Sequence, residues 1–110
     1  MKLPLDLRFI GVTPSEAVKD TVQTRIDSLK RICPDATAWR VTVEQEHKHQ
    51  QQGRPFAVRV DVTMPGQEVA VSRVHDEDVY VALREAFDAA RRKIEDVVRI
   101  RRGEVKRHAA

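Results

Sequence analysis

The most constraining feature of this 110-residue chain is the stretch FAVRVDVTM at residues 56–64. Apolar side chains alternate there with Arg59, Asp61 and Thr63, which is the period of a strand with one buried and one solvated face. The letters MPGQ follow, with proline and glycine in the order that a type II turn prefers. The alternation resumes at Val69. The stretch therefore predicts a hairpin whose apolar face a second layer has to cover.

A helix is predicted from the letters TPSE at residues 13–16. Thr13 can cap this helix, Pro14 suits its first turn, and Glu16 completes a capping box. Apolar residues then recur at three- and four-residue steps until Pro34 ends the pattern. Alternating stretches on either side, LDLRF and WRVTV, predict two more strands.

A second helix is predicted from EDVYVALREAFDAARR at residues 77–92 and its continuation. Asp76 or Asp78 is expected to cap its N-terminus. Apolar residues recur at helical spacing as far as Val98, and Gly103 is expected to end the helix.

The element order is therefore β-α-β-β-β-α in one domain, residues 1–103, followed by a basic C-terminal tail at residues 104–110. Because every strand and helix has a single apolar side, we expect an α+β fold of two layers, with both helices on one face of a four-stranded sheet. The first helix would connect two parallel strands. The other face of the sheet is expected to be solvated.

Several functional classes lack support in the sequence. The N-terminus has no signal-peptide core and no apolar run reaches the length of a membrane span, so we expect a cytoplasmic protein. Cys33, the one cysteine, is predicted to be a buried structural thiol. The sequence has no glycine-rich phosphate loop, nucleophile elbow or HExxH motif. We expect neither an enzyme nor a bound cofactor.

The polar loop between the second and third strands contains the pair His47 and His49. Alternate residues share a side, so both imidazoles could reach one metal ion, but only His75 and scattered acids are available as further ligands. A solvated loop is the favoured interpretation, and a metal-binding protein is the alternative.

The predicted open face of the sheet carries no aromatic platform of the kind that stacks unpaired bases. Phe9, Trp39 and Phe56 share the register of the buried aliphatic residues and are expected in the core. The open face is thus predicted to be a solvated surface of mixed charge.

The net charge of +3 is concentrated near the C-terminus, where residues 99–108 hold five basic residues and one acidic residue. On the second helix Arg84, Arg91 and Arg102 share one line, and Arg92 and Arg99 share the next. Together with the basic residues of the first helix they can form a ridge along a phosphate backbone. Spacing alone favours a solvated charged face over a binding face, because Asp88 and Glu95 interrupt the ridge.

The order of elements and several segments resemble the ribosome hibernation-promoting factor family, also described as ribosome-associated inhibitors or sigma-54 modulation proteins. The resemblance is carried by FIGVTP at 9–14, RIDSLKR at 25–31, VRVDVTMPGQEV at 58–69 and HDEDVYVALREAFDAARRKIE at 75–95. Asp78, Tyr80 and Ala82 match the segment of the family that precedes its charged helix.

The resemblance implies a ribosome hibernation factor that acts in stationary phase and in the stress response. Such a factor binds small-subunit rRNA, blocks the path of mRNA and tRNA, and keeps the ribosome inactive. Arg25, Arg31 and Arg92 match basic positions of the family. The chain departs from the family at positions that often carry Lys or Arg: Ser28, Ala89, Glu95, Asp96 and Val98. These departures leave the rRNA footprint open. Longer members use an extra C-terminal domain to hold two ribosomes together as a dimer, and this sequence does not contain that domain.

The resulting prediction is a short hibernation factor whose partner is the small ribosomal subunit. The alternative is a protein-interaction module on the same fold that does not bind ribosomes. The predicted RNA-binding residues all lie on the two helices: Lys19, Arg25, Lys30, Arg31, Arg84, Arg91, Arg92, Lys93, Arg99 and Arg102.

Overall fold

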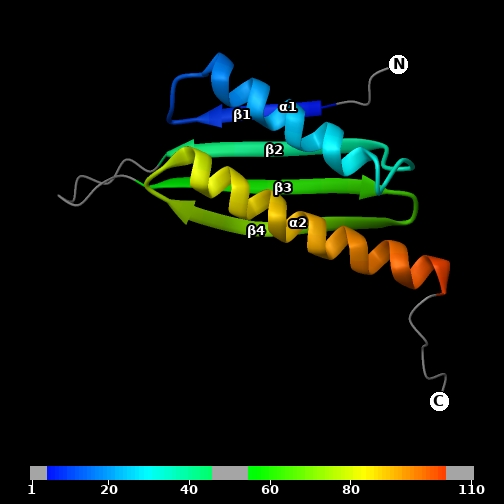
Figure 1. Ribbon diagram of the computed structural model, residues 1–110. Helices are drawn as coiled ribbons and strands as arrows, with labels where there is room; N and C mark the ends of the chain where they lie inside the picture. The colour runs from blue at the N-terminus through cyan, green and yellow to red at the C-terminus, as the bar shows by residue number, and fades with distance from the viewer. Residues whose placement is uncertain (1–4, 46–54, 104–110) are drawn as a thin grey trace.

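The computed structural model describes residues 5–45 and 55–103, apart from the side chains of Ser72, Arg73 and Arg102. The chain forms four strands and two helices in the predicted order (Figure 1). Their bounds are β1 Leu5–Ile10, α1 Glu16–Lys30, β2 Ala38–Gln45, β3 Phe56–Met64, β4 Gln67–Asp76 and α2 Val79–Arg102.

The four strands form one sheet in the order β1-β2-β3-β4. β1 pairs with β2 in parallel, and the other two pairings are antiparallel. The parallel pair requires a crossover, which α1 supplies. This arrangement confirms the α+β architecture predicted from the sequence.

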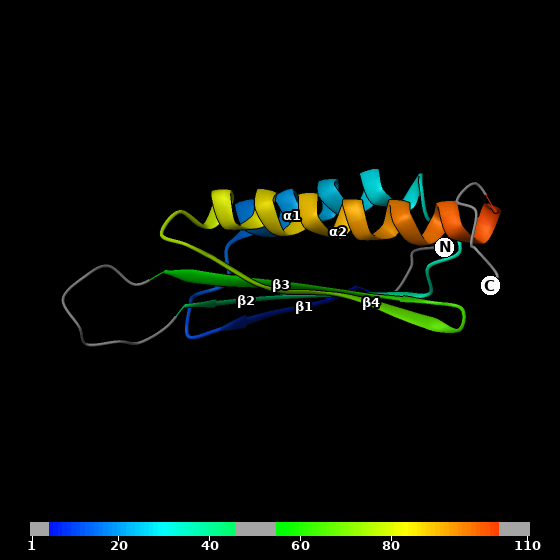
Figure 2. The same cartoon turned by 90° about the horizontal axis from the view of Figure 1, so that it is seen from below.

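Both helices lie on one face of the sheet and leave the other face open (Figure 2). They run in the same direction, and α2 packs against β3 and β4 (Figure 1). The apolar sides of the helices and strands meet in one core, in which Trp39 is 1% exposed. Phe9 and Phe56 were predicted in that core but are only partly buried at its margin. Phe9 lies on the edge strand β1 and Phe56 at the first position of β3, where fewer neighbours cover a side chain.

The start of α1 differs from the prediction. Ser15 is the capping residue, with extended backbone angles, and its hydroxyl oxygen accepts a hydrogen bond from the Val18 backbone N–H at 3.2 Å. The helix therefore begins after Pro14, and Thr13 does not cap it. Serine caps at least as well as threonine, so a cap two residues later costs the helix nothing.

The two ends of α2 are as predicted. Asp78 caps the first turn by accepting a hydrogen bond from the Tyr80 backbone N–H at 2.8 Å. Asp76, the other candidate, accepts from the Asp78 backbone N–H. Gly103 ends the helix with φ of 79°, a left-handed conformation that glycine adopts without steric cost.

A positive φ also fixes the turn between β3 and β4, where Gly66 has φ of 77°. Beyond this turn the register of the two strands shifts between Val58 and Val60. Between these pairs one residue of β3 faces two of β4, because Val58 pairs with Val74 and Val60 with Val71. Such a bulge distorts the outer strand β4 and makes it a poorer template for another chain.

Candidate nucleic-acid interface

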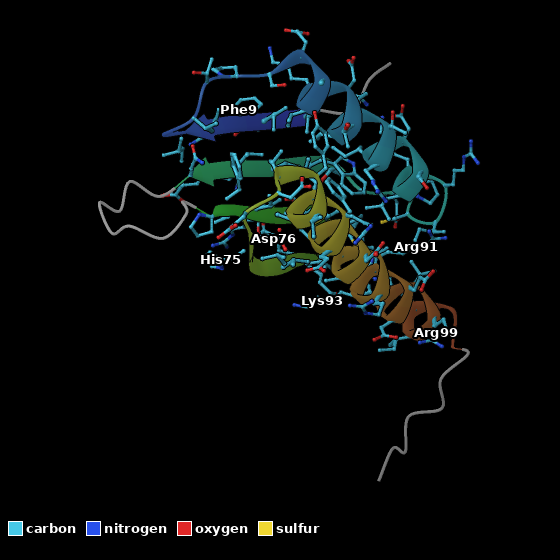
Figure 3. All side chains as sticks on the ribbon, turned by 60° about the vertical axis from the view of Figure 1, so that its left-hand side comes forward. Phe9, His75, Asp76, Arg91, Lys93 and Arg99 are labelled. Carbon is cyan, nitrogen blue, oxygen red and sulfur yellow. The ribbon has the colours of Figure 1, made fainter. Side chains whose placement is uncertain are left out.

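The predicted basic residues occupy three different places on the helix layer. The first is the side of each helix that faces the other helix. Arg91 points toward α1 (Figure 3), and Arg84 lies two helical turns earlier on the same line. Arg25 of α1 lies opposite them, because the other flank of α1, with Lys19 and Gln23, lines a hollow beside β1. We call Arg25, Arg84 and Arg91 the interhelical row.

The second place is the surface that points away from the sheet. Arg92 and Arg99 lie two turns apart on the outer side of α2, and both are exposed. Arg31 caps the C-terminus of α1 and is exposed on the same side of the molecule. We call Arg31, Arg92 and Arg99 the outer row.

The third place is the outer flank of each helix, away from the other helix. Lys19 and Lys30 occupy that flank of α1. Lys93 occupies the corresponding flank of α2, where its ammonium group donates to the backbone oxygen of Ala70 on β4 at 2.7 Å (Figure 3). The structure therefore does not gather Lys93 with the arginines of α2.

Four of the predicted cations are engaged with acids of their own helix. Lys19 contacts Glu16 at 3.3 Å and Lys30 contacts Asp27 at 3.7 Å. On α2, Arg91 contacts Glu95 at 3.2 Å, and Arg99 contacts Asp96. All four are pairs at three- or four-residue spacing between side chains that are partly or largely exposed.

The acids in these pairs compete only weakly with a phosphate for the basic side chain. An exposed ion pair contributes about 0–1 kcal/mol, because water screens it and two long side chains lose freedom. Guanidinium pairing with phosphate is bidentate and charge-assisted. The pairs therefore reduce the charge of the helix face without closing it to a polyanion.

The other four cations are available. Within residues 5–45 and 55–103, no acid forms an ion pair with Arg25, Arg31, Arg84 or Arg92. Arg25 is half-buried and the other three are exposed. The side chain of Arg102, the tenth predicted residue, lies outside the described part of the chain.

One arginine outside the predicted set fixes the end of α2. Arg101 donates to the backbone oxygen of Pro65 in the β3–β4 turn and lies 3.6 Å from the carboxylate of Asp35. It ties the C-terminal turn of α2 to the β3–β4 turn and to the loop after α1. Sequence spacing gives no sign of this role, because both contacts come from distant segments.

The open face of the sheet uses its charges differently. Asp6 contacts Arg8 at 3.2 Å and Arg40 at 3.7 Å. Asp61 accepts from the Arg59 Nε at 3.1 Å and is only 7% exposed. The prediction of a solvated, mixed-charge face is wrong for Asp61, because neighbouring side chains of the sheet cover it.

Among the described residues, neither the Cys33 thiol nor a histidine forms a second site. Burial, and then the nearby Asp35 carboxylate, raise the pKa of the Cys33 thiol, which is fully buried and donates to Asp35. That environment suits a structural thiol rather than a nucleophile. His47 and His49 lie outside the described residues. In the described ranges, no group of three or more histidine, cysteine or acidic side chains could hold a metal ion.

The comparison with protein families is decisive for ancestry. A model of the family described as sigma 54 modulation protein / S30EA ribosomal protein matches residues 5–102, from the first strand to the end of α2. The chain belongs to this family. The resemblance inferred from FIGVTP, RIDSLKR and the α2 segment is thereby confirmed. Comparison with curated proteins gives no match.

Two solved structures share the fold of this family member. A ribosomal subunit interface protein from Coxiella burnetii is 14% identical, with a TM-score of 0.66, and the match covers 92% of this chain and 99% of that one. The N-terminal domain of Protein Y from Thermus thermophilus is 21% identical, also with a TM-score of 0.66, and the match covers 88% and 99% of the two chains. Within the described residues, no helix is both long and apolar enough to cross a membrane.

Proposed function

We propose that this protein binds the small ribosomal subunit through its helix layer and stops translation by occupying the path of mRNA and tRNA. The interhelical and outer rows would contact rRNA phosphates, and the bulk of the domain would exclude the other ligands. This mode of action needs no catalytic step and no cofactor. It assigns ribosome binding to residues 1–103 and places the protein in the cytoplasm; the basic tail at residues 104–110 lies outside the described residues.

The single observation that carries the proposal is the state of Arg25, Arg31, Arg84 and Arg92. They lie on the two rows of the helix layer and have no ion-pair partner among the described residues. An unpaired guanidinium can take up phosphate without first breaking another contact. Each such contact releases a counterion from the nucleic acid, which gives affinity together with a dependence on salt.

Family membership supports the same partner. The family carries the description of a ribosomal protein, and one solved relative of the same fold is called a ribosomal subunit interface protein. The helix layer is also the more basic part of this molecule, because α2 alone holds seven basic and four acidic residues. We expect the rRNA footprint to differ in detail from that of other members, because the chain departs from the family at five positions: Ser28, Ala89, Glu95, Asp96 and Val98.

The test is sedimentation of the purified protein with isolated small subunits over a series of salt concentrations. We expect co-sedimentation at about 50 mM salt and a steep loss by about 200 mM, because several phosphate contacts are made at once. Addition of the protein should also inhibit translation and displace labelled mRNA from the subunit. Failure to sediment with subunits at the low salt concentration would refute the proposal.

A protein-interaction module remains a second candidate, favoured by the ion pairs Arg91–Glu95 and Arg99–Asp96 on the helix layer. Paired charges of both signs suit a mixed-charge protein surface better than a polyanion. This candidate predicts a complex in cell extracts that survives nuclease digestion. The ribosome proposal instead predicts that digestion of rRNA releases the protein.

A further inference from the structure

The N-terminal part of α2 exposes an aromatic ring that the phosphate contacts do not explain. Tyr80 is 45% exposed, although it lies in the first turn of a helix whose apolar side packs on the sheet. Within the described residues, only Ile10 and Ile100 are other large hydrophobic side chains with comparable exposure. Tyr80 is the one among them that can stack on a planar ligand.

The position of Tyr80 connects it to the interhelical row. Tyr80 and Arg84 are four residues apart on α2, so their Cβ atoms are about 5–6 Å apart on one side of the helix. Arg84 is exposed and forms no ion pair with a described residue. An exposed ring and an available guanidinium therefore lie side by side, on the flank of α2 that carries Arg91.

The spacing of Tyr80 and Arg84 along the helix suits the base and the phosphate of one nucleotide. The base of a nucleotide and its own phosphate are separated by a single sugar, a span comparable to one helical turn. A ring stacks on any base, whereas a guanidinium pairs with a phosphate. A duplex keeps its bases stacked on each other, so only an unpaired nucleotide can use both groups together.

We propose that Tyr80 and Arg84 form a nucleotide site for single-stranded RNA, with the base stacked on the Tyr80 ring and the phosphate held by Arg84. The site rests on the proposed function and deepens it. It means that the helix layer recognises an unpaired nucleotide of the subunit, such as one in a loop or a bulge, in addition to phosphates. The rest of the two rows would supply contacts that duplex RNA can also satisfy.

The acids near the start of α2 are compatible with this site. Asp76 and Asp78 accept hydrogen bonds from backbone N–H groups at the helix start, where the helix dipole offsets negative charge. Glu77 precedes α2, which begins at Val79, and it is an exposed acid close to the ring in sequence. Glu77→Gln is therefore expected to strengthen RNA binding slightly, since it removes repulsion without touching the ring.

The test compares Tyr80→Ala, Tyr80→Leu and Tyr80→Phe for binding to a single-stranded RNA oligonucleotide, to a duplex of the same sequence and to small subunits. Loss of one stacked base predicts about 5- to 100-fold weaker binding to single-stranded RNA for the alanine and leucine variants. Their dependence on salt should stay unchanged, because no charge is removed. Tyr80→Phe should bind as the wild type does, and the duplex should be affected less than about twofold.

Two controls complete the design. Ile100→Ala removes another exposed hydrophobic side chain of α2 and should leave binding to every RNA unchanged. Arg84→Gln should reduce the salt slope for single-stranded RNA by about 0.7, the value for one phosphate contact. Tyr80→Leu retains a bulky side chain, so it reports on stacking even if the alanine variant unfolds.

The outcomes separate this site from the proposed function. If the wild type does not bind small subunits at low salt, ribosome binding itself is refuted. If the wild type binds subunits and Tyr80→Leu binds equally well to subunits and to the single strand, only the nucleotide site is refuted. Equal weakening for duplex and single strand would also refute the site, because stacking on Tyr80 requires an unpaired base.

Discussion

The two faces of this molecule both carry arginines, but among the described side chains only the helix layer leaves arginines available. On the open sheet face, Arg8, Arg40 and Arg59 each contact a carboxylate of the same sheet. On the helix layer, four arginines have no such partner among the described residues: Arg25, Arg31, Arg84 and Arg92. The comparison teaches that the pairing of charges, rather than their number, distinguishes a candidate binding face.

Backbone geometry explains the difference. In a sheet, residues two apart point to the same side and residues opposite each other on neighbouring strands lie about 4.5–5.5 Å apart. Asp6 precedes Arg8 by two positions and is the register partner of Arg40, so both contacts follow from the strand pairing. A helix offers partners only at three- and four-residue spacing. Arg25 has Thr21, Val22, Ser28 and Leu29 at those positions, and none of these is acidic.

Competition for acids is one reason that α2 has unpaired arginines, although Asp88, four residues from both Arg84 and Arg92, forms an ion pair with neither of these described side chains. Arg92 has Glu95 and Asp96 within its reach along the helix, but these contact Arg91 and Arg99. Six basic and two acidic residues lie between Arg91 and Arg102, so acids are too few to pair every cation there. A surplus of this kind remains whatever rotamers the side chains adopt.

The largest effect is expected on the sheet face, where pairing is part of the fold. Asp61→Asn should destabilise the domain by about 1–3 kcal/mol, because it removes a covered carboxylate whose two oxygens share a charge-assisted hydrogen bond from the Arg59 Nε–H. The measurement is urea denaturation followed by Trp39 fluorescence.

The matched control is Asp96→Asn on the helix layer. It breaks an ion pair between exposed side chains and should change stability by less than about 1 kcal/mol. Equal losses of stability for the two variants would remove the contrast between the faces.

The next largest effect concerns RNA. Arg84→Gln combined with Arg92→Gln should lower the salt slope of subunit binding by about 1.4–1.8, which corresponds to roughly a tenfold change in the ratio of affinities at 50 and 200 mM salt. Arg8→Gln combined with Arg40→Gln removes the same charge from the sheet face and should leave the slope unchanged. A slope that falls equally in both double variants would mean that only net charge matters.

The smallest effect comes from releasing an arginine that is now paired. Glu95→Gln frees Arg91 from its contact at 3.2 Å and removes a negative charge beside the interhelical row. Subunit affinity should rise about two- to fivefold, which is the scale of one exposed ion pair. Binding titrations at constant salt would detect it, and weaker binding would show that Glu95 itself contributes to recognition.

The fold was largely predictable from this sequence because its signals are local. The alternation at residues 56–64 fixed which faces of β3 are buried, and Asp78 and Gly103 marked the ends of α2. The start of α1 was not predicted to the residue, because Thr13 and Ser15 are both capping residue types two positions apart, and their preferences differ only slightly.

The candidate site was predictable only in part. Helical spacing placed Arg84 and Arg91 on one line, but it gives no information about what lies beside that line. Lys93 and Arg101 contact backbone oxygens of β4 and of the β3–β4 turn, which are far away in the sequence. The burial of Asp61 likewise depends on tertiary packing, which cannot be read from the spacing of residues in the sequence.

The central claim is that the helix layer, and not the open sheet face, meets rRNA. The most direct measurement is a cryo-electron microscopy structure of the protein bound to the small subunit at low salt. The account predicts rRNA phosphates within hydrogen-bond distance of Arg25, Arg84 and Arg92, with the sheet face turned away. A complex in which Arg8, Arg40 and Arg59 face the rRNA and the helices face solvent would contradict it.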